Sequence, residues 1–549
     1  MINKTLALPT RTQLLDMTIL VIIYVISVVV VDPLGDFPLN DDWAFARPVM
    51  SLVEHGDWRP TGFSGMSLIT QSLWGAIFCL PAGFSFNALR LSTLILAIVG
   101  VLGVYLLFVA NNSKRVVAMA AAFTLGFNPI YYELSNTFMT DVPFTTLAIF
   151  STMFFMRCIW RFDYLDLSIA CALAMAATLC RQLGLFLPLA FAVVIVMQRG
   201  FTKIWLCRAI VPSIICVAAL MLFELWMRNT GRMPVNYGIS GGYIANRSMS
   251  IKAIAFRTDT ALLYLGLFCL PMLLLLNSSS PRFNTNSAIL RAVPALSGGL
   301  FALLSIYFTF GLHKSWMPVP VPGNILISQG LGPLTIRGSY EQLPSPFWVI
   351  VTVLSVVGGV LLIRAMIASS IVLVRRIAIL SERDFIQIFF VMAVGIYALP
   401  ILVGGLFDRY LVPLVPFFLF LLYLNADWLA HEGVGPTIQK FASVVLIAFI
   451  AAFSVLGTRD YLTWNRIRWE AIARFQETSS VSAHDIGGGF EYKGWFLYDP
   501  ESEWWVEDNK YVIAFSIIPG FKIIRSYAYT TWMPPRARML FLLERGTGI

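Results

Sequence analysis

Three aspartates at the edges of apolar segments could carry chemistry. Asp41 and Asp42 are adjacent and follow the first apolar segment, and Asp141 precedes a later one. Two neighbouring carboxylates repel each other. This repulsion is most easily tolerated where one of them acts as a base, binds a divalent metal, or pairs with a cation such as Arg47. Helix capping is an equally good explanation, because Asp accepts hydrogen bonds from the free N–H groups at a helix start.

Two arginines stand where a charge is costly. Arg181 interrupts the apolar stretch 167–197 near its middle, and Arg409-Tyr410 stands at the start of a later apolar stretch. Charged residues at membrane depth usually face a cavity or a partner, so these cations are candidates for binding an anionic group. An arginine that snorkels to lipid phosphates is the alternative for Arg181. Asp408 could neutralise its neighbour Arg409.

The sequence lacks the motifs of several common enzyme classes. No H-E-x-x-H, P-loop or G-x-S-x-G is present, which argues against the commonest metalloproteases, ATPases and serine hydrolases. The histidines are dispersed and the cysteines lie in apolar stretches without metal-ligand spacing. A divalent metal at Asp41 and Asp42 is possible, but no further ligands are in view.

The composition shows which elements must position these residues. Of 549 residues, 58% are hydrophobic and only 13% are charged, whereas a soluble chain carries roughly 25% charged residues. The chain is therefore an integral membrane protein. Its net charge of +9 is typical of multi-pass membrane proteins, which collect Lys and Arg in their cytoplasmic loops. We expect no nucleic-acid partner.

The apolar segments predict an all-α polytopic protein with about thirteen membrane crossings of about 20 residues each. Residues 68–80 are too short for a crossing, so we expect an interfacial or re-entrant helix on the outer face. The crossings are expected near 17–31 and 89–110, twice within 116–160, twice within 167–197, and near 204–226, 258–276, 293–313, 346–368, 386–405, 410–427 and 441–457.

The positive-inside rule orients these crossings. Lys4 and Arg11 precede the first one, which places the N-terminus in the cytoplasm. An odd number of crossings then puts the C-terminus outside, together with the first loop, residues 32–67. We expect a transmembrane catalytic domain at 1–457 and a small external α/β domain at 458–549, with strands at 511–518, 521–527 and 539–543.

One loop conflicts with this orientation. Residues 228–257 contain five basic residues and no acidic one, which the positive-inside rule disfavours outside the cell. Either the number of crossings predicted before this loop is wrong, or its basic residues bind an anionic ligand. Arg232, Arg247 and Lys252 are accordingly possible substrate-binding residues, together with Arg47 of the first loop.

These features are similar to those of the GT-C glycosyltransferases. The likeness lies in the cytoplasmic N-terminus, the external acidic pair, the acid in Met-Thr-Asp-Val-Pro, and the late Arg-Tyr-Leu-Val-Pro-Leu-Val-Pro. Within that class the chain most resembles the branch that contains protein O-mannosyltransferases and the lipid A aminoarabinose transferase. The resemblance covers about residues 15–427 and implies a GT-C type fold with external juxtamembrane helices.

The resemblance also implies an activity. Such enzymes of the inner (plasma) membrane transfer a sugar from a polyprenyl-phosphate carrier, on the outer face, to a lipid, glycan or protein acceptor. The transfer is a single inverting displacement and requires no nucleotide or redox cofactor. One of Asp41 and Asp42 would deprotonate the acceptor hydroxyl. The family motif is often Asp-Glu, and the Asp at the second position here leaves open which carboxylate is the base.

Further roles follow from the same resemblance. Asp141 corresponds to the second acid of the branch, which helps to position the acceptor or the first-loop carboxylate. Arg181-Gln182 stands where many members have Lys followed by Gly, and would bind the carrier phosphate. Arg409 and Tyr410 fit the late Arg-Tyr pattern and form a second phosphate candidate.

Two other functions would use similar residues. A transporter or flippase of a lipid-linked sugar also needs intramembrane cations and an outer cavity, but internal repeats are typical of transporters and none is found here. A non-catalytic membrane subunit would leave Asp41 and Asp42 dispensable. An activity assay on carboxylate variants would separate the enzyme from both alternatives.

Overall fold

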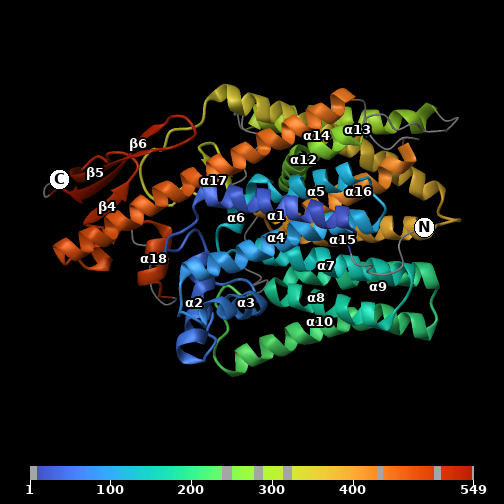
Figure 1. The fold of residues 1–549 in the computed structure, drawn as a ribbon, viewed down its shortest axis with the longest axis horizontal. Helices are drawn as coiled ribbons and strands as arrows, with labels where there is room; N and C mark the ends of the chain where they lie inside the picture. Colours follow the sequence, from blue (N-terminus) through green and yellow to red (C-terminus); the bar gives the residue numbers. More distant parts are fainter. Residues whose placement is uncertain are drawn as a thin grey trace.

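A computed structural model describes residues 9–237, 250–276, 288–312, 324–429, 437–499 and 509–546. Within these residues the chain forms a bundle of long helices with a small β-sheet at one end (Figure 1). We call this end, which holds the strands β4 (Tyr511–Ala514), β5 (Phe521–Thr530) and β6 (Ala537–Arg545), the sheet end.

Eleven helices in the described part of the chain are long and apolar enough to cross a membrane. This confirms a multi-pass, mostly helical protein. Two shorter apolar helices, α5 (Arg115–Gly126) and α8 (Tyr164–Cys180), stand at two further predicted crossings, so the count of thirteen stays a prediction. The eleven are α1 (Arg11–Val31), α4 (Phe86–Ala110), α7 (Asp141–Trp160), η1 (Gln182–Leu185) with α9 (Phe186–Arg199), α10 (Lys203–Asn229), α12 (Ile251–Leu275), α13 (Ala288–Ile306), α14 (Ser345–Arg375), α15 (Glu382–Gly404), η3 (Asp408–Leu411) with α16 (Leu414–Leu429), and α17 (Thr437–Ser479).

The long helices pack through small residues and expose apolar ones. On α1, Ile26 and Val29 are exposed, as expected of a surface that faces lipid instead of water. Helices α12 and α14 approach each other so closely that a Cβ atom on Gly266 would lie 2.2 Å from the backbone nitrogen of Gly359. Small residues at such crossings let membrane helices come into van der Waals contact.

The C-terminal region forms the expected small sheet. The strand order is β3–β4–β6–β5, where β3 (Ile486–Gly487) is parallel to β4 and the other pairs are antiparallel. The helix α18 (Phe490–Leu497) follows β3. Helix α17 runs without a break across residues 457 and 458, so the proposed domain boundary falls inside a continuous helix.

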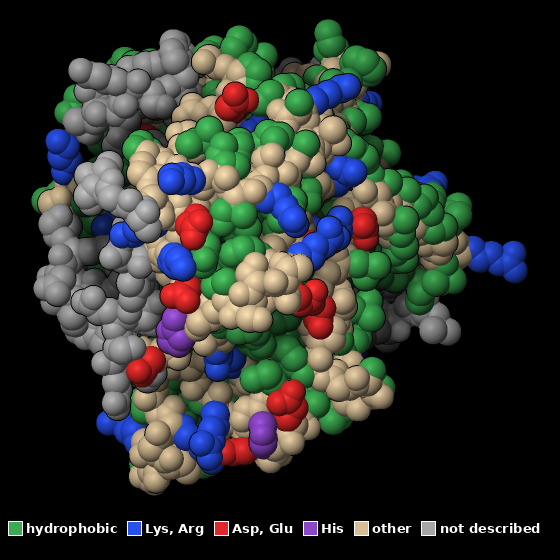
Figure 2. All heavy atoms as spheres, turned by 90° about the vertical axis from the view of Figure 1, so that its left-hand side faces the viewer, with side chains coloured by type: hydrophobic (Ala, Val, Ile, Leu, Met, Phe, Trp, Pro, Cys, Tyr) green, Lys and Arg blue, Asp and Glu red, His purple; other side chains and the backbone are tan. Residues whose placement is uncertain are grey.

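The segments that were predicted to lie outside meet at the sheet end. Arg409 contacts Asp41 of the first loop, and Glu491 of α18 contacts Asn40. The short helices α2 (Asp42–His55) and α3 (Ile69–Cys79) lie at the same end (Figure 1). Figure 2 shows this end, where charged side chains are interspersed among apolar ones. Which side of the membrane it faces stays a prediction.

Candidate active site

The first loop is fixed by an arginine from the neighbouring helix. Arg90 of α4 is 2% exposed, and it donates hydrogen bonds to the carbonyl oxygens of Pro33 (2.9 Å), Gly35 (2.6 Å) and Phe37. A buried guanidinium that binds three backbone carbonyls holds the loop in one shape. The sequence analysis missed Arg90, although its charge inside an apolar segment is the same signal that identified Arg181.

The two adjacent aspartates have different environments. Asp42 is fully buried and its carboxylate accepts hydrogen bonds from the backbone N–H groups of Leu39 and, at 3.4 Å, of Phe138. Burial raises the pKa of Asp42 from 3.8 to about 8, despite these bonds. The Asp42 carboxyl group therefore ties the first loop to the segment before α7.

Asp41 instead faces a cation. The Nη2 atom of Arg409 donates to Asp41 Oδ2 at 2.9 Å, and the Asp41 side chain keeps 14% of its surface exposed. Asp41 occupies the N-cap position of α2, but its side chain makes no capping hydrogen bond. Its partner is not Arg47, which donates to the carbonyl oxygen of Trp495 and lies over that ring.

Asp408 acts electrostatically on its neighbour Arg409, as expected, but its hydrogen bonds go to backbone groups. Its carboxylate accepts the backbone N–H groups of Ile325 (2.9 Å), Leu326 (2.7 Å) and Arg409 itself (2.7 Å). Asp408 thus shapes the segment that begins β1 (Leu326–Ile327) and holds η3 against it. The Arg409 guanidinium is left to Asp41, and its buried Nε atom has no hydrogen-bond partner within the described residues.

A second ion pair joins Asp141 and Arg181. The Nη1 atom of Arg181 donates to Asp141 Oδ1, and both side chains are almost fully buried. Arg181 ends α8 at the turn into η1, where a Cβ atom on Gly184 would lie 2.4 Å from the backbone nitrogen of Thr178. The tight turn thus depends on glycine. Because Arg181 is only 3% exposed, it does not snorkel to lipid headgroups.

The two ion pairs form one cluster. The Tyr410 ring lies 5.2 Å from the guanidinium carbon of Arg181 and 5.7 Å from that of Arg409. Asp141 also acts electrostatically on Arg409. We call Asp41, Arg409, Asp141 and Arg181 the two-pair cluster. It combines two carboxylates with two guanidinium groups. The guanidinium group of arginine is the side-chain group best suited to bidentate phosphate binding.

Glu133 is a further acid at this site that the sequence analysis missed. It lies on α6 (Pro129–Ser135), is 1% exposed, and neither carboxyl oxygen has a hydrogen-bond partner within the described residues. Asp408, Asp42, Arg409 and Asp141 all act on it electrostatically. Its signal in the sequence is an isolated acid within a largely apolar region.

The other predicted binding residues lie apart from the two-pair cluster. Arg232 pairs with Asp57 at 2.7 Å and lies over the Trp226 ring. Lys252 is exposed near the start of α12. Arg247 lies outside the described residues. The ion pair of Arg232 shows that the basic loop finds its acidic partner in the first loop.

The acids at the site do not fit a metal centre. In the described ranges no group of three His, Cys, Asp or Glu side chains could hold a metal ion. Asp42 already accepts two backbone N–H groups, and Asp41 accepts the guanidinium of Arg409.

A buried ion pair connects the site to the C-terminal region. Arg468 of α17 and Glu491 of α18 are both fully buried, with 3.0 Å between Nη1 and Oε2. The other Glu491 oxygen accepts the backbone N–H of Asn40 at 3.0 Å, directly before the acidic pair. The C-terminal region therefore helps to place Asp41.

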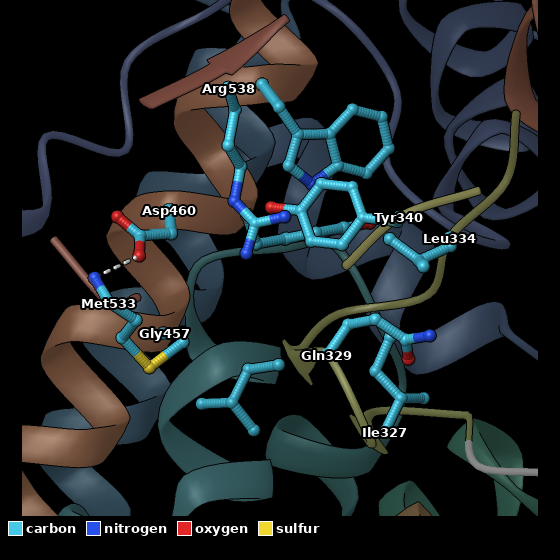
Figure 3. Close-up of a pocket in the computed structure, with 11 residues that line it drawn as sticks. Ile327, Gln329, Leu334, Tyr340, Gly457, Asp460, Met533 and Arg538 are labelled. Atoms are coloured by element: carbon cyan, nitrogen blue, oxygen red, sulfur yellow. Dashed lines mark hydrogen bonds between the residues drawn. The ribbon is translucent and has the colours of Figure 1, made fainter. Parts of the chain in front are cut away.

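A small pocket lies where the C-terminal sheet meets α17 (Figure 3). It is shallow and opens to solvent. Arg538 stacks on the Tyr340 ring at 3.9 Å, and Asp460 accepts the backbone N–H of Met533 at 2.8 Å. Tyr461 also lines this pocket, and Glu133 and Asp42 act on it electrostatically. The pocket therefore lies next to the candidate site.

A comparison with protein families supports the predicted resemblance. Residues 69–227 match the family model described as dolichyl-phosphate-mannose-protein mannosyltransferase. The matched segment runs from α3 into α10 and includes Asp141 and Arg181, whereas Asp41 and Arg409 lie outside it. The match confirms the resemblance to this class of glycosyltransferases over these residues. No curated protein sequence matches the chain.

Several solved structures are similar to the chain at low sequence identity. ArnT from Cupriavidus metallidurans bound to undecaprenyl phosphate is 15% identical, with 95% of this chain and 97% of that chain covered and a TM-score of 0.38. The oligosaccharyltransferase from Archaeoglobus fulgidus is 13% identical, with 84% and 58% covered and a TM-score of 0.40. The arabinosyltransferase EmbB from Mycobacterium smegmatis is 15% identical, with 84% and 43% covered and a TM-score of 0.33.

Proposed function

We propose that the protein is a membrane glycosyltransferase that transfers a sugar from a polyprenyl-phosphate carrier to a hydroxyl group of a lipid, glycan or protein acceptor. The observation that carries this proposal is the two-pair cluster, which places a partly exposed carboxylate beside two buried arginines. Displacement of a lipid phosphate by a hydroxyl group requires both kinds of side chain: a base for the incoming oxygen and cations for the departing one.

Asp41 is the proposed base. Its side chain retains some exposure and has a cation as its partner, whereas the Asp42 carboxyl group is buried and bonded to backbone N–H groups. In the transfer, the acceptor oxygen forms a bond to the anomeric carbon while the bond from that carbon to the phosphate oxygen breaks. The acceptor proton passes to Asp41, and the electron pair leaves with the phosphate. The configuration at the anomeric carbon is inverted.

Arg409 and Arg181 are proposed to bind the departing phosphate. Arg409 couples phosphate binding to proton uptake by Asp41. A phosphate that accepts the N–H groups of Arg409 weakens the bond between Arg409 and Asp41, and this makes the Asp41 carboxylate a stronger base. Asp141 holds Arg181 in place through their ion pair, and the Tyr410 ring lies near both guanidinium groups. Donor binding would thereby prepare the base.

The same proposal predicts which side of the membrane the sheet end faces. Polyprenyl-phosphate sugars are used on the outer face by the family that the chain resembles, so we place the sheet end outside the plasma membrane. The catalytic membrane domain is proposed to span 1–457, and the remainder, 458–549, to form the external domain. The C-terminal domain would then contribute to the active site through the hydrogen bond that Glu491 accepts from Asn40 of the first loop.

A transfer assay tests the proposal. Purified protein in lipid nanodiscs is incubated with undecaprenyl-phosphate-linked hexoses and pentoses and a membrane extract as acceptor, and release of undecaprenyl phosphate is measured by mass spectrometry. Release that Asp41→Asn abolishes supports the enzyme. Asp57→Asn is the matched control, because Asp57 belongs to the same loop but pairs with Arg59 and Arg232. Translocation of intact donor without release would instead identify a flippase.

A further inference from the structure

Glu133 is held rigidly within the candidate site. All residues of α6 are buried, and its start is capped by Asn128, whose side chain accepts the backbone N–H groups of Ile130 and Tyr131 at 3.1 Å. The Tyr131 hydroxyl donates to the carbonyl oxygen of Ala97 at 2.9 Å. The backbone that carries Glu133 is thus fixed on several sides, and its carboxyl group is positioned before any ligand arrives.

The other acids of the site have their hydrogen bonds satisfied at least in part. Asp41 and Asp141 bond to arginines, and Asp42 and Asp408 accept backbone N–H groups. Glu133 has no such partner within the described residues, although it is buried like Asp42, Asp141 and Asp408. An unpaired buried carboxylate would cost several kcal/mol, so the group has to be neutral or to meet a ligand.

The surrounding charges favour the neutral form. Asp42 of α2, Asp141 of α7 and Asp408 of η3 act on Glu133, Tyr461 of α17 lies near it, and Arg409 supplies the opposing positive charge. Burial, followed by the repulsion from these acids, holds the pKa of Glu133 well above its usual range. A neutral carboxylic acid carries one O–H donor, which in Glu133 is unused.

We propose that Glu133 is a further substrate-binding residue, which donates a hydrogen bond from its neutral carboxyl group to an oxygen atom of the donor phosphate held by Arg409. The inference rests on the proposed function. A phosphate offers only acceptor oxygens to its surroundings, and Arg409 marks the part of the site where negative charge is favoured. An ionised Glu133 would repel the phosphate, whereas the protonated side chain supplies the donor that the phosphate needs.

Two substitutions separate this role from simple packing. Glu133→Gln keeps a neutral N–H donor of similar shape, whereas Glu133→Met keeps the volume and removes the donor. We expect E133M to weaken binding of undecaprenyl phosphate by about 10- to 100-fold, as for the loss of a hydrogen bond to a charged group. E133Q should restore most of that affinity. It should also remove the loss of binding that we expect of the wild type as the pH rises and Glu133 ionises.

Binding is measured with undecaprenyl phosphate itself, so that the result does not depend on transfer. Equal binding by E133M and the wild type would overturn the inference while leaving the proposed function intact, provided that Arg409→Gln binds weakly. A loss in E133Q as large as that in E133M would show that an ionised carboxylate is required and would also overturn it. Absence of binding by the wild type would overturn the proposed function as well.

An infrared measurement tests the wild type without relying on stable variants. The difference spectrum on addition of undecaprenyl phosphate should show a shift in the carbonyl stretch of a protonated carboxyl group. The shift should persist in Asp42→Asn, which removes the other neutral acid of the site, and should disappear in E133Q. A spectrum without a shift in the wild type, under conditions where binding is saturated, would overturn the inference.

Discussion

The Nη2 atom of Arg409 donates a hydrogen bond to Asp41 at 2.9 Å, across 368 positions of the chain. The proposed base and a proposed phosphate-binding residue are therefore partners before any substrate arrives. This bond orients the Asp41 carboxylate. In the proposed mechanism the donor phosphate would take over the guanidinium group, so the ion pair would restrain the base until the donor binds.

Asp41→Asn is expected to fold and to reduce transfer by about 100-fold or more, because it removes the general base. The asparagine carbonyl can still accept a hydrogen bond from Arg409, which limits the loss of stability. Steady-state rates of donor consumption check this prediction, with Asp57→Asn as the control. Wild-type turnover by Asp41→Asn would contradict the assignment of the base.

Asp42→Asn is expected to change stability more than chemistry. The folded-state pKa of Asp42 is raised from 3.8 to about 8, so the folded protein binds a proton that the unfolded chain releases. The stabilising contribution is fully present below about pH 4 and is lost as the pH rises through about 8. Thermal unfolding between these pH values should give a falling Tm for the wild type and a flatter profile for Asp42→Asn.

Arg181→Gln should reduce donor affinity or turnover by roughly 10- to 100-fold, and Arg181→Lys should recover part of the loss. The single substitution also leaves Asp141 buried without its partner, which costs about 3 to 5 kcal/mol of stability. The double variant Arg181→Gln, Asp141→Asn should regain stability without regaining transfer. Recovery of both would mean that the ion pair serves only the fold.

Neutralising Arg232 provides a contrast to Arg181. Arg232 is partly exposed and pairs with Asp57, so Arg232→Gln should cause only a shallow loss that diminishes with salt, given a screening length of about 8 Å at physiological ionic strength. The loss at Arg181 should be insensitive to salt. Equal, salt-sensitive losses at both positions would remove Arg181 from the proposed site.

Cysteine labelling tests the orientation. In a background without the seven native cysteines, of which only Cys207 is exposed in the structure, single cysteines at positions 113 and 378 should react from the cytoplasm. Cysteines at positions 36 and 517 should react from outside. Reaction of position 517 only from inside would reverse the sheet end and separate it from an outer-face reaction.

The sequence predicted the elements better than their contacts. Long apolar runs identify membrane helices because a helix must satisfy its own backbone in lipid, and short segments of the tail predicted its strands. Asp41, Arg181 and Arg409 were recognised because a charge beside an apolar run is costly. Their pairing was not predictable, because it depends on how helices that are distant in sequence pack together.

Other features were missed for related reasons. Asp42 has the same residue type as Asp41, and only the fold decides that one is buried against backbone N–H groups while the other faces a cation. Glu133, Arg468 and Glu491 gain their significance from burial, which a single sequence does not reveal for polar side chains. Glu491 and Arg468 lie in the C-terminal tail, where charged residues are unremarkable until they are found fully buried.

Helix α17 is the longest described helix, and it also carries Arg468, which supports the candidate site through Glu491. At 1.5 Å per residue its 43 residues extend about 65 Å, roughly twice the 30 Å of a membrane core. Asp460 and Arg468 attach the half nearer the sheet end to the segment between β5 and β6 and to α18. One inserted residue there would rotate everything beyond it by about 100° and break both attachments. Related chains can therefore vary the loops around this helix freely, but its half nearer the sheet end only by near-whole turns.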